Sequence, residues 1–149
     1  MANVSSDSGT ARPIVVGVDG SESSKVALRW AADQAELTGA HLVVICTWEP
    51  QYEMDRSGAR PKIADAQGIV QAILERTADE VLGTHRAADK ITLTVIHGHP
   101  APTLIDLSQT ASLLVVGSRG HGEFTGMLLG SVSQHLATHA HCPVAIIRG

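Results

Sequence analysis

The segment from Gly117 to Ser131 carries the residues best suited to chemistry. Gly117 and Gly120 follow the apolar run Leu113 to Val116, and Gly130-Ser131 stands where a helix is expected to begin. Glycine permits positive φ and lets the backbone approach a ligand closely, because it has no Cβ. N–H groups in the first turn of a helix have no intrahelical partner, and that end of the helix is positive. The order of strand, glycine-rich loop and helix is therefore suited to a phosphate, although a plain turn would use the two glycines as well.

The first turn of this helix offers the hydrogen-bond donors. The N–H groups of Ser131, Val132 and Ser133 are predicted to meet phosphate oxygens, and the two serine hydroxyls to add hydrogen bonds. An alternative needs no ligand: Ser131 with Gln134 three residues later matches a capping box. The sequence leaves both roles open for Ser131.

Charged and polar side chains also occur in the loop, where Ser118, Arg119 and His121 are candidate ligand contacts. Arg119 and His121 could neutralise phosphate, although solvated loop residues are the commoner case. His135 and His139 lie four residues apart on the following helix, with His141 nearby, yet no carboxylate or cysteine completes a metal site at a helical spacing. We therefore predict a solvated face there and no metal site.

Five apolar runs and four helical segments must position these residues. The expected strands are Pro13–Val18, Leu42–Thr47, Ile91–His97, Leu113–Val116 and Val144–Ile147. Helices are expected from Ser21, an N-cap residue, to about Thr38, over about Ile63–His85, over about Pro102–Thr110 and from Ser131. Strands that alternate with helical crossovers predict an α/β fold, a doubly wound parallel sheet with helices on both faces.

Two finer expectations concern the segment between the second strand and the second helix and the apolar faces of the first two helices. The polar segment from Trp48 to Pro61 shows no period and holds two prolines, so it is expected to be a long loop. Helical spacing predicts apolar stripes that face the core. On the first helix this stripe consists of Val26, Ala27, Trp30, Ala31 and Leu37, and on the second of Ala66, Ile69, Val70, Ile73, Leu74, Thr77 and Val81.

Length and composition bound the protein class. A chain of 149 residues with 44% hydrophobic and 3% aromatic residues is the size of one domain, expected over residues 13–149 behind a flexible tail at 1–12. A net charge of −4 gives no footprint for nucleic acid or an anionic membrane. No apolar run approaches ~20 residues and the N-terminus lacks a signal-peptide core, so we expect a cytoplasmic protein whose Cys46 and Cys142 are reduced.

Motifs that the sequence lacks narrow the function further. It contains no GxxxxGK(S/T) motif, so a P-loop NTPase is excluded, and the first strand-to-helix turn, VGVDGS, departs from the GxGxxG of dinucleotide-binding enzymes. The hydrolase motif GxSxG and the redox motif CxxC are also missing.

Two long segments resemble the universal stress protein family. VVGVDGSESSKVALRWAADQAELTGAHLVV is similar to the family's opening, and VVGSRGHGEFTGMLLGSVSQHLATHAHCPVAII to its end. The second contains GxxG, nine residues, then G(S/T), which is the ATP-binding signature of the family's nucleotide-binding branch. GHPAPTLIDL resembles the family's third strand-to-helix turn, whereas Ser112 stands where the family often has Asp.

The resemblance implies the strand order 3-2-1-4-5, homodimers through the fifth strand, and ATP bound with Mg²⁺ at its phosphates. In that order the first and fourth strands border the topological switch point, where open α/β sheets bind ligands. Asp19 would then accept hydrogen bonds from ribose hydroxyls or an adenine amino group, or help to hold a metal, although Asp19-Gly20-Ser21 is also an ordinary turn and cap. Gly17 would leave room for the base, and Cys46 and Thr47 would border the adenine.

The leading hypothesis is a homodimeric, cytoplasmic stress-response protein that binds ATP and acts through nucleotide-dependent contacts. A slow ATPase or nucleotidyl transferase is the enzymatic alternative, but no nucleophile and base are marked, so no catalytic residue is assigned. AMP or cyclic AMP could replace ATP, and a dimer that only interacts with other proteins is a further alternative. The sequence does not name the stress or the protein partner.

Overall fold

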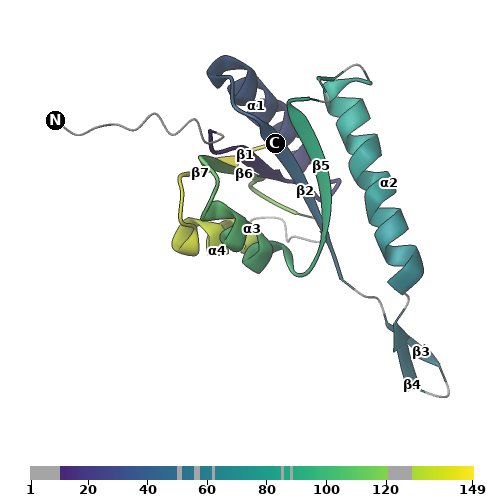
Figure 1. Cartoon of the computed structure of the whole chain (residues 1–149). Coiled ribbons are helices and arrows are strands. Elements are labelled where there is room, and N and C mark those ends of the chain that lie inside the picture. Colours follow the sequence, from purple (N-terminus) through teal and green to yellow (C-terminus); the bar gives the residue numbers. More distant parts are fainter. Residues whose placement is uncertain are drawn as a thin grey trace.

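The computed structural model describes residues 11–49, 52–55, 58–61, 63–84, 86–87, 89–120 and 129–149, with side chains omitted in the hairpin at 52–61 and at 63–65. Figure 1 shows the arrangement of the elements. They are β1 (Ile14–Gly17), α1 (Glu22–Thr38), β2 (Leu42–Trp48), β3 (Tyr52–Asp55), β4 (Gly58–Pro61), α2 (Ile63–Leu82), β5 (Ile91–His97), α3 (Pro100–Ser108), β6 (Leu113–Gly117), α4 (Ser131–His139) and β7 (Val144–Ile147).

A five-stranded parallel sheet forms the centre, in the order β5-β2-β1-β6-β7. Counting these strands along the chain gives the order 3-2-1-4-5, so the predicted sheet is confirmed. Val15 of β1 pairs with Val43 on one side and with Leu114 on the other. β1 and β6 consist almost wholly of Ile, Leu and Val because both faces of a parallel sheet are covered.

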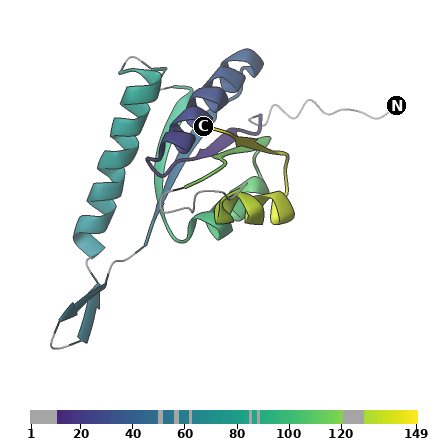
Figure 2. The same ribbon diagram turned by 180° about the vertical axis from the view of Figure 1, so that it is seen from behind.

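Helices cover the two faces in pairs, as Figures 1 and 2 show from opposite sides. One core packs α1 and α2 against the sheet and contains the buried side chains of Leu28 and Leu74. The other packs α3 and α4 against the opposite face and contains Leu104 and Leu136. The doubly wound architecture is therefore confirmed.

Local signals place the ends of the helices. Ser21 is the N-cap of α1, as predicted, and its Oγ accepts the N–H of Ser24 at 3.2 Å. Gly39 ends α1 in the left-handed region at φ 71°. α2 ends at Leu82 because Gly83 takes φ 82°, earlier than the predicted end at His85, which lies outside the described residues. α3 begins at Pro100, two residues before the predicted start, because extended His99 caps it.

The expectation of a long loop over Trp48–Pro61 is wrong, because β3 and β4 form an antiparallel hairpin there. Its register pairs Tyr52 with Pro61 and Met54 with Ala59. Proline is tolerated at the end of an edge strand, so Pro61 does not prevent the pairing. Figures 1 and 2 show the hairpin away from the sheet, beyond the N-terminal end of α2.

The predicted apolar stripes are correct only in part. On α1 the buried face is Ser24, Ala27, Leu28, Ala31 and Ala35, whereas Leu37 is 79% exposed. On α2, Leu74 is fully buried but Ile69 and Ile73 are exposed. Helical spacing identifies residues that share a face, but it does not show how much of that face a neighbouring element covers. Within the described residues, no helix is long and apolar enough to cross a membrane.

Candidate functional site

A cleft of about 210 Å³ opens at the carboxyl ends of β1, β2 and β6, at the topological switch point of the sheet. One water needs roughly 10–15 Å³ of such volume, so the cleft has room for a group much larger than a single water molecule. Its walls come from strand ends, from the loop after β6 and from the start of α4, with further side chains from α1, α2 and α3.

Most of the predicted site residues line this cleft. They are Gly17, Asp19, Cys46, Thr47, Gly117, Arg119, Gly120, Gly130, Val132 and Ser133. Ser118 is buried and Ser131 is exposed, and neither lines the cleft. His121 lies outside the described residues.

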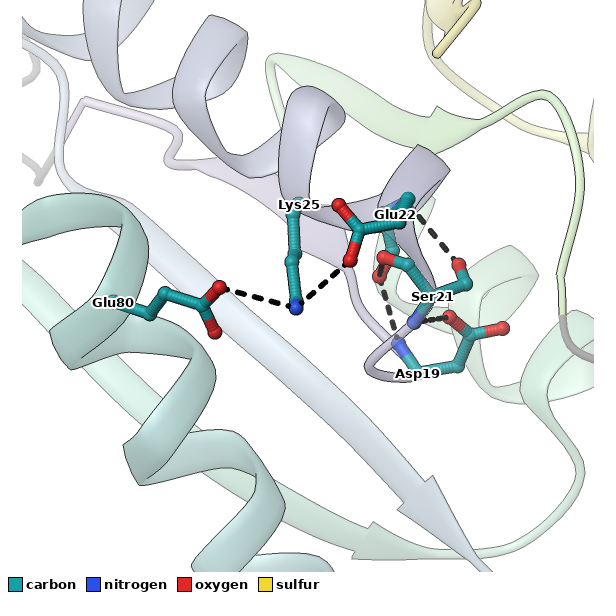
Figure 3. Close-up of polar contacts among 6 residues, drawn as sticks. Asp19, Ser21, Glu22, Lys25 and Glu80 are labelled. Carbon is teal, nitrogen blue, oxygen red and sulfur yellow. Dashed lines mark hydrogen bonds and ion pairs between the residues drawn. The ribbon is translucent and has the colours of Figure 1, made fainter.

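Asp19 forms the predicted turn and also lines the cleft. Its Oδ1 accepts the N–H of Ser21 at 2.9 Å, which forms the turn that leads to the cap of α1 (Figure 3). The same exposed carboxylate lines the cleft. A Cβ at Gly120 would lie 2.8 Å from Asp19 Oδ2, so the loop after β6 passes directly against this carboxylate.

Lys25 joins the two helices on this face of the sheet. Its Nζ lies 3.1 Å from Oε1 of Glu22 on α1 and 3.2 Å from Oε1 of Glu80 on α2 (Figure 3). The hydrogen bond to Glu22 raises the pKa of Lys25 most, and the hydrogen bond to Glu80 raises it further. The bridge therefore stays charged at neutral pH and links α2 to the turn of α1 that follows Asp19.

The expectation that Gly117 and Gly120 adopt positive φ is wrong. Gly117 is instead required because another chain segment packs closely against it. A Cβ at Gly117 would lie 2.7 Å from the carbonyl carbon and 2.8 Å from the carbonyl oxygen of Ser23. The described glycines with positive φ are Gly20, Gly39, Gly83 and Gly98, and neither Gly117 nor Gly120 is among them. The end of β6 thus lies directly against the first turn of α1.

The first turn of α4 is held in place by the chain on both sides of the loop. Gly130 is the N-cap, and its N–H donates to the Ser118 carbonyl at 2.6 Å. Ser118 in turn donates its N–H to the carbonyl of Ile147 at 2.8 Å. These two bonds close the loop at its base and aim the start of α4 at the cleft.

Two expectations for this turn need correction. The capping box between Ser131 and Gln134 is absent, since Gly130 is the cap and Gln134 Nε2 donates to the carbonyl of Leu129 at 3.0 Å. The Ser133 hydroxyl, on a residue that is 1% exposed, donates to the carbonyl of Gly117 at 2.8 Å. That hydroxyl proton ties α4 to β6 and does not point to a ligand, so the backbone N–H is the donor that Ser133 can offer to a phosphate.

Cys46 lies on the floor of the cleft, 5% exposed. Burial, with a smaller contribution from the negative charge of Asp19, raises its pKa to about 11. The thiol is therefore protonated at neutral pH and is a poor nucleophile. Cys142 is half-buried beside β6, burial also raises its pKa, and both cysteines are free thiols.

Sequence reasoning missed the apolar walls of the cleft. The additional lining residues are the polar Ser24 and the apolar Val18, Ile45, Val70, Ile73, Pro100, Leu104 and Val116. The helical period of α2 does mark Val70 and Ile73, but it predicts a core role for them. Nothing in that period distinguishes a wall of a cleft from a wall of the core.

Several histidines of the described segments have local partners. His135 Nδ1 lies 2.8 Å from the Ser131 carbonyl, and its ring centroid lies 6.4 Å from that of His139. His97 packs on the Trp48 ring with centroids 4.6 Å apart, and His99 Nδ1 lies 2.5 Å from Glu49 Oε1. In the described part of the chain, no three His, Cys, Asp or Glu side chains gather closely enough to hold a metal ion.

Comparisons with known proteins identify relatives of one family. The chain is 37% identical over 150 residues to Universal stress protein Rv1996 of Mycobacterium tuberculosis. This match covers 90% of the chain and 47% of the relative. It is 36% identical over 149 residues to a universal stress protein of Mycolicibacterium smegmatis, which covers 91% of this chain and 45% of the relative. The chain thus spans about half the length of the curated relatives it matches.

Solved structures agree. A universal stress protein in complex with cAMP matches with a TM-score of 0.69 and 30% identity over 91% of this chain and 96% of that chain. The Lactobacillus plantarum protein UspA, at 18% identity, shares the fold with a TM-score of 0.70 over 93% of this chain and 99% of its own. The model of the universal stress protein family matches residues 10–148. This chain belongs to the universal stress protein family.

Proposed function

We propose that the cleft binds an adenine nucleotide, with ATP as the leading candidate, and that the protein acts in a stress response through contacts that depend on nucleotide occupancy. The observation that carries this proposal is the joint placement of Asp19, Arg119 and the first turn of α4 around one cleft at the switch point of the sheet. These groups come from chain segments about a hundred residues apart, and they meet where open α/β sheets bind ligands.

The phosphates would lie at the α4 end. The N–H groups of Val132 and Ser133 belong to a first helical turn and have no intrahelical acceptor, and the helix end is positive. Arg119 also lines the cleft, and its guanidinium carries a full positive charge that suits phosphate. The residues from Gly117 to Ser131 also carry the GxxG, nine residues, G(S/T) signature, which supports assignment of this end to phosphate.

The ribose and base would lie toward β1 and β2. Asp19 lines the cleft, and carboxylate oxygens are hydrogen-bond acceptors suited to ribose hydroxyls. Cys46 and Thr47 end β2 on the floor of the cleft, where they would border the adenine. Within the described lining, Asp19 and Arg119 are the charged side chains, so we propose that a triphosphate brings Mg²⁺ as its counter-charge.

A nucleoside monophosphate or cyclic AMP is the second candidate. A relative that is 30% identical was solved with cAMP. One arginine in the described lining balances a singly charged phosphodiester without a metal ion. The enzymatic alternative has less support, because the thiol on the cleft floor is protonated at neutral pH and we assign no catalytic residue.

We also propose a homodimer through β7. This strand is at the edge of the sheet, and its residues Val144 to Ile147 are each half-buried. An apolar edge strand with unpaired backbone groups is a template for a second strand.

Isothermal titration calorimetry tests the nucleotide site. ATP with and without Mg²⁺, AMP, cAMP and GTP are titrated into nucleotide-free protein, and into Asp19→Asn and Arg119→Gln. Asp19→Asn keeps an oxygen that can accept the Ser21 N–H, so the turn survives while the charge is lost. We expect saturable adenine-nucleotide binding that both variants weaken, Arg119→Gln more for ATP than for AMP. Failure of every adenine nucleotide to bind would overturn the proposal.

A further inference from the structure

The cleft is lined by residues of different chemistry from different elements. Asp19, after β1, and Arg119, after β6, contribute charged groups. On the side of β2 and β5, where α2 packs, the lining includes the apolar side chains of Val70 and Ile73. A ligand that combines a charged group with a flat apolar ring matches both kinds of lining.

Ile73 is an exposed large hydrophobic residue at the wall of this cleft. Its side chain is 38% exposed, although it sits one residue before fully buried Leu74. Ile69, one turn earlier on the same helix, is 59% exposed and does not line the cleft. Water in contact with an apolar surface is unfavourable, so a ring that covers Ile73 would be stabilised by the area it removes from water.

The helix that carries this wall is firmly positioned. Leu74 and Ala78 are fully buried against the sheet, and Glu80 pairs with Lys25 of α1 at 3.2 Å. Because Glu22 holds the same lysine, α2 is tied to the turn that follows Asp19. Residues on a fixed helix keep a constant distance to the charged groups of the cleft, which is a requirement for selection by size.

We propose that Val70 and Ile73 form a base wall, an apolar surface that packs on the ring of the bound nucleotide and selects a two-ring purine over a single-ring pyrimidine. The proposal rests on the nucleotide site proposed above and names the residues that determine its selectivity. A purine offers two rings to the base wall, whereas a pyrimidine buries less of Ile73 and gains less from the same contact.

The test compares Ile73→Ala with Ile69→Ala, a matched change on the same helix one turn away. AMP, CMP and ribose 5-phosphate are titrated by calorimetry into each variant and the parent chain, and circular dichroism confirms that each is folded. Ile73→Ala should weaken AMP roughly tenfold, which corresponds to about 1.4 kcal/mol and to the burial of one to two CH₂ groups. Ribose 5-phosphate should bind as before, the preference for AMP over CMP should shrink, and Ile69→Ala should change nothing.

Two further outcomes separate this inference from the proposed function. If the parent chain binds AMP and Ile73→Ala binds it equally well, or if Ile69→Ala or ribose 5-phosphate shows the same loss, the base wall is overturned while the nucleotide site stands. If the parent chain binds no nucleotide, the proposed function fails first. Ile73→Met, which nearly conserves volume, should retain most of the affinity and guards against a general effect on folding.

Discussion

At the residue scale, Gly117 occupies the point where the end of β6 touches the first turn of α1. A Cβ there would meet backbone atoms of Ser23, which cannot move aside without shifting the helix. We expect Gly117→Ala to lower the free energy of unfolding by about 1–3 kcal/mol, the usual cost of overpacking. Urea denaturation measures this loss, and a variant as stable as the parent chain would contradict it.

Two other glycines serve as controls for Gly117→Ala. At Gly17 the nearest atom to a new Cβ is Cδ1 of Leu104 at 2.9 Å, the flexible end of a side chain, so Gly17→Ala should cost less. At Gly68, inside α2, nothing lies within 4 Å, and Gly68→Ala should stabilise by roughly 0.5–1 kcal/mol. Loss of nucleotide binding in Gly117→Ala would therefore not by itself identify a ligand contact.

Cys46 makes stability depend on pH in the alkaline range. Its pKa is about 11 in the fold against 9.0 for the free thiol, so the unfolded chain loses this proton first as the pH rises. The stability is fully present below pH 9 and is lost progressively between pH 9 and 11, by roughly 3 kcal/mol at most.

Urea unfolding at pH 8 and pH 10 measures this loss. Cys46→Ala should lack most of the decline, whereas Cys142→Ala should keep it. The pKa of Lys25 is also raised, so its deprotonation at high pH lowers the stability of the parent chain and of both cysteine variants alike. An equal decline in the parent chain and in Cys46→Ala would show that the thiol is not responsible.

At the element scale, sequence patterns predicted the sheet and the caps, but not the degree to which each helix is covered. Apolar runs locate the parallel strands because both faces are buried, and Ser21 locates the start of α1 through its capping oxygen. The exposure of Ile69 and Ile73 depends on where α2 crosses the sheet, which no local spacing contains. The hairpin of β3 and β4 was missed because its short strands lack a run of β-branched residues.

The hairpin is expected to be the least stable described element. β3 and β4 make their extensive contacts with each other, whereas α2 packs on β2, β5 and α1. A two-stranded hairpin is marginal in water without a further packing partner. Its amide hydrogens should therefore exchange near the unprotected rate, while those of β2 and β5 exchange slowly. Hydrogen exchange followed by mass spectrometry measures this contrast, and equal protection of β3 and β2 would contradict it.

At the scale of the whole molecule, the candidate site exists only because the later strands are added on both sides of β1. Strands β2 and β5 lie on one side and β6 and β7 on the other, so Asp19 and Gly120 meet although they are distant in sequence. The family resemblance implies this strand order, whereas periodicity predicts only that the sheet is parallel. The contribution of α2 to the cleft cannot be inferred from the sequence pattern, because it depends on the packing of the complete domain.

The proposed dimer through β7 gives the last prediction. Leu114 donates its N–H to the Pro143 carbonyl at 3.0 Å and Ser118 donates to that of Ile147 at 2.8 Å. Backbone groups alternate along a strand, so those of Ala145 face β6 while those of Ile146 face outward. Ile146→Pro therefore removes a donor at the free edge and no hydrogen bond within the sheet, and proline is tolerated on edge strands.

We expect Ile146→Pro to sediment as a folded monomer and the parent chain as a dimer. Ile146→Ala loses the same side chain but keeps the N–H, and should remain dimeric. Ala145→Pro removes a hydrogen bond between β7 and β6, so this variant should unfold. A folded Ile146→Pro beside an unfolded Ala145→Pro would show that the Ile146 N–H faces the outer edge of the sheet. Sedimentation equilibrium distinguishes these states. If Ile146→Pro stays dimeric, the subunits associate through another surface, since pairing across the outer edge of β7 needs the N–H that this change removes.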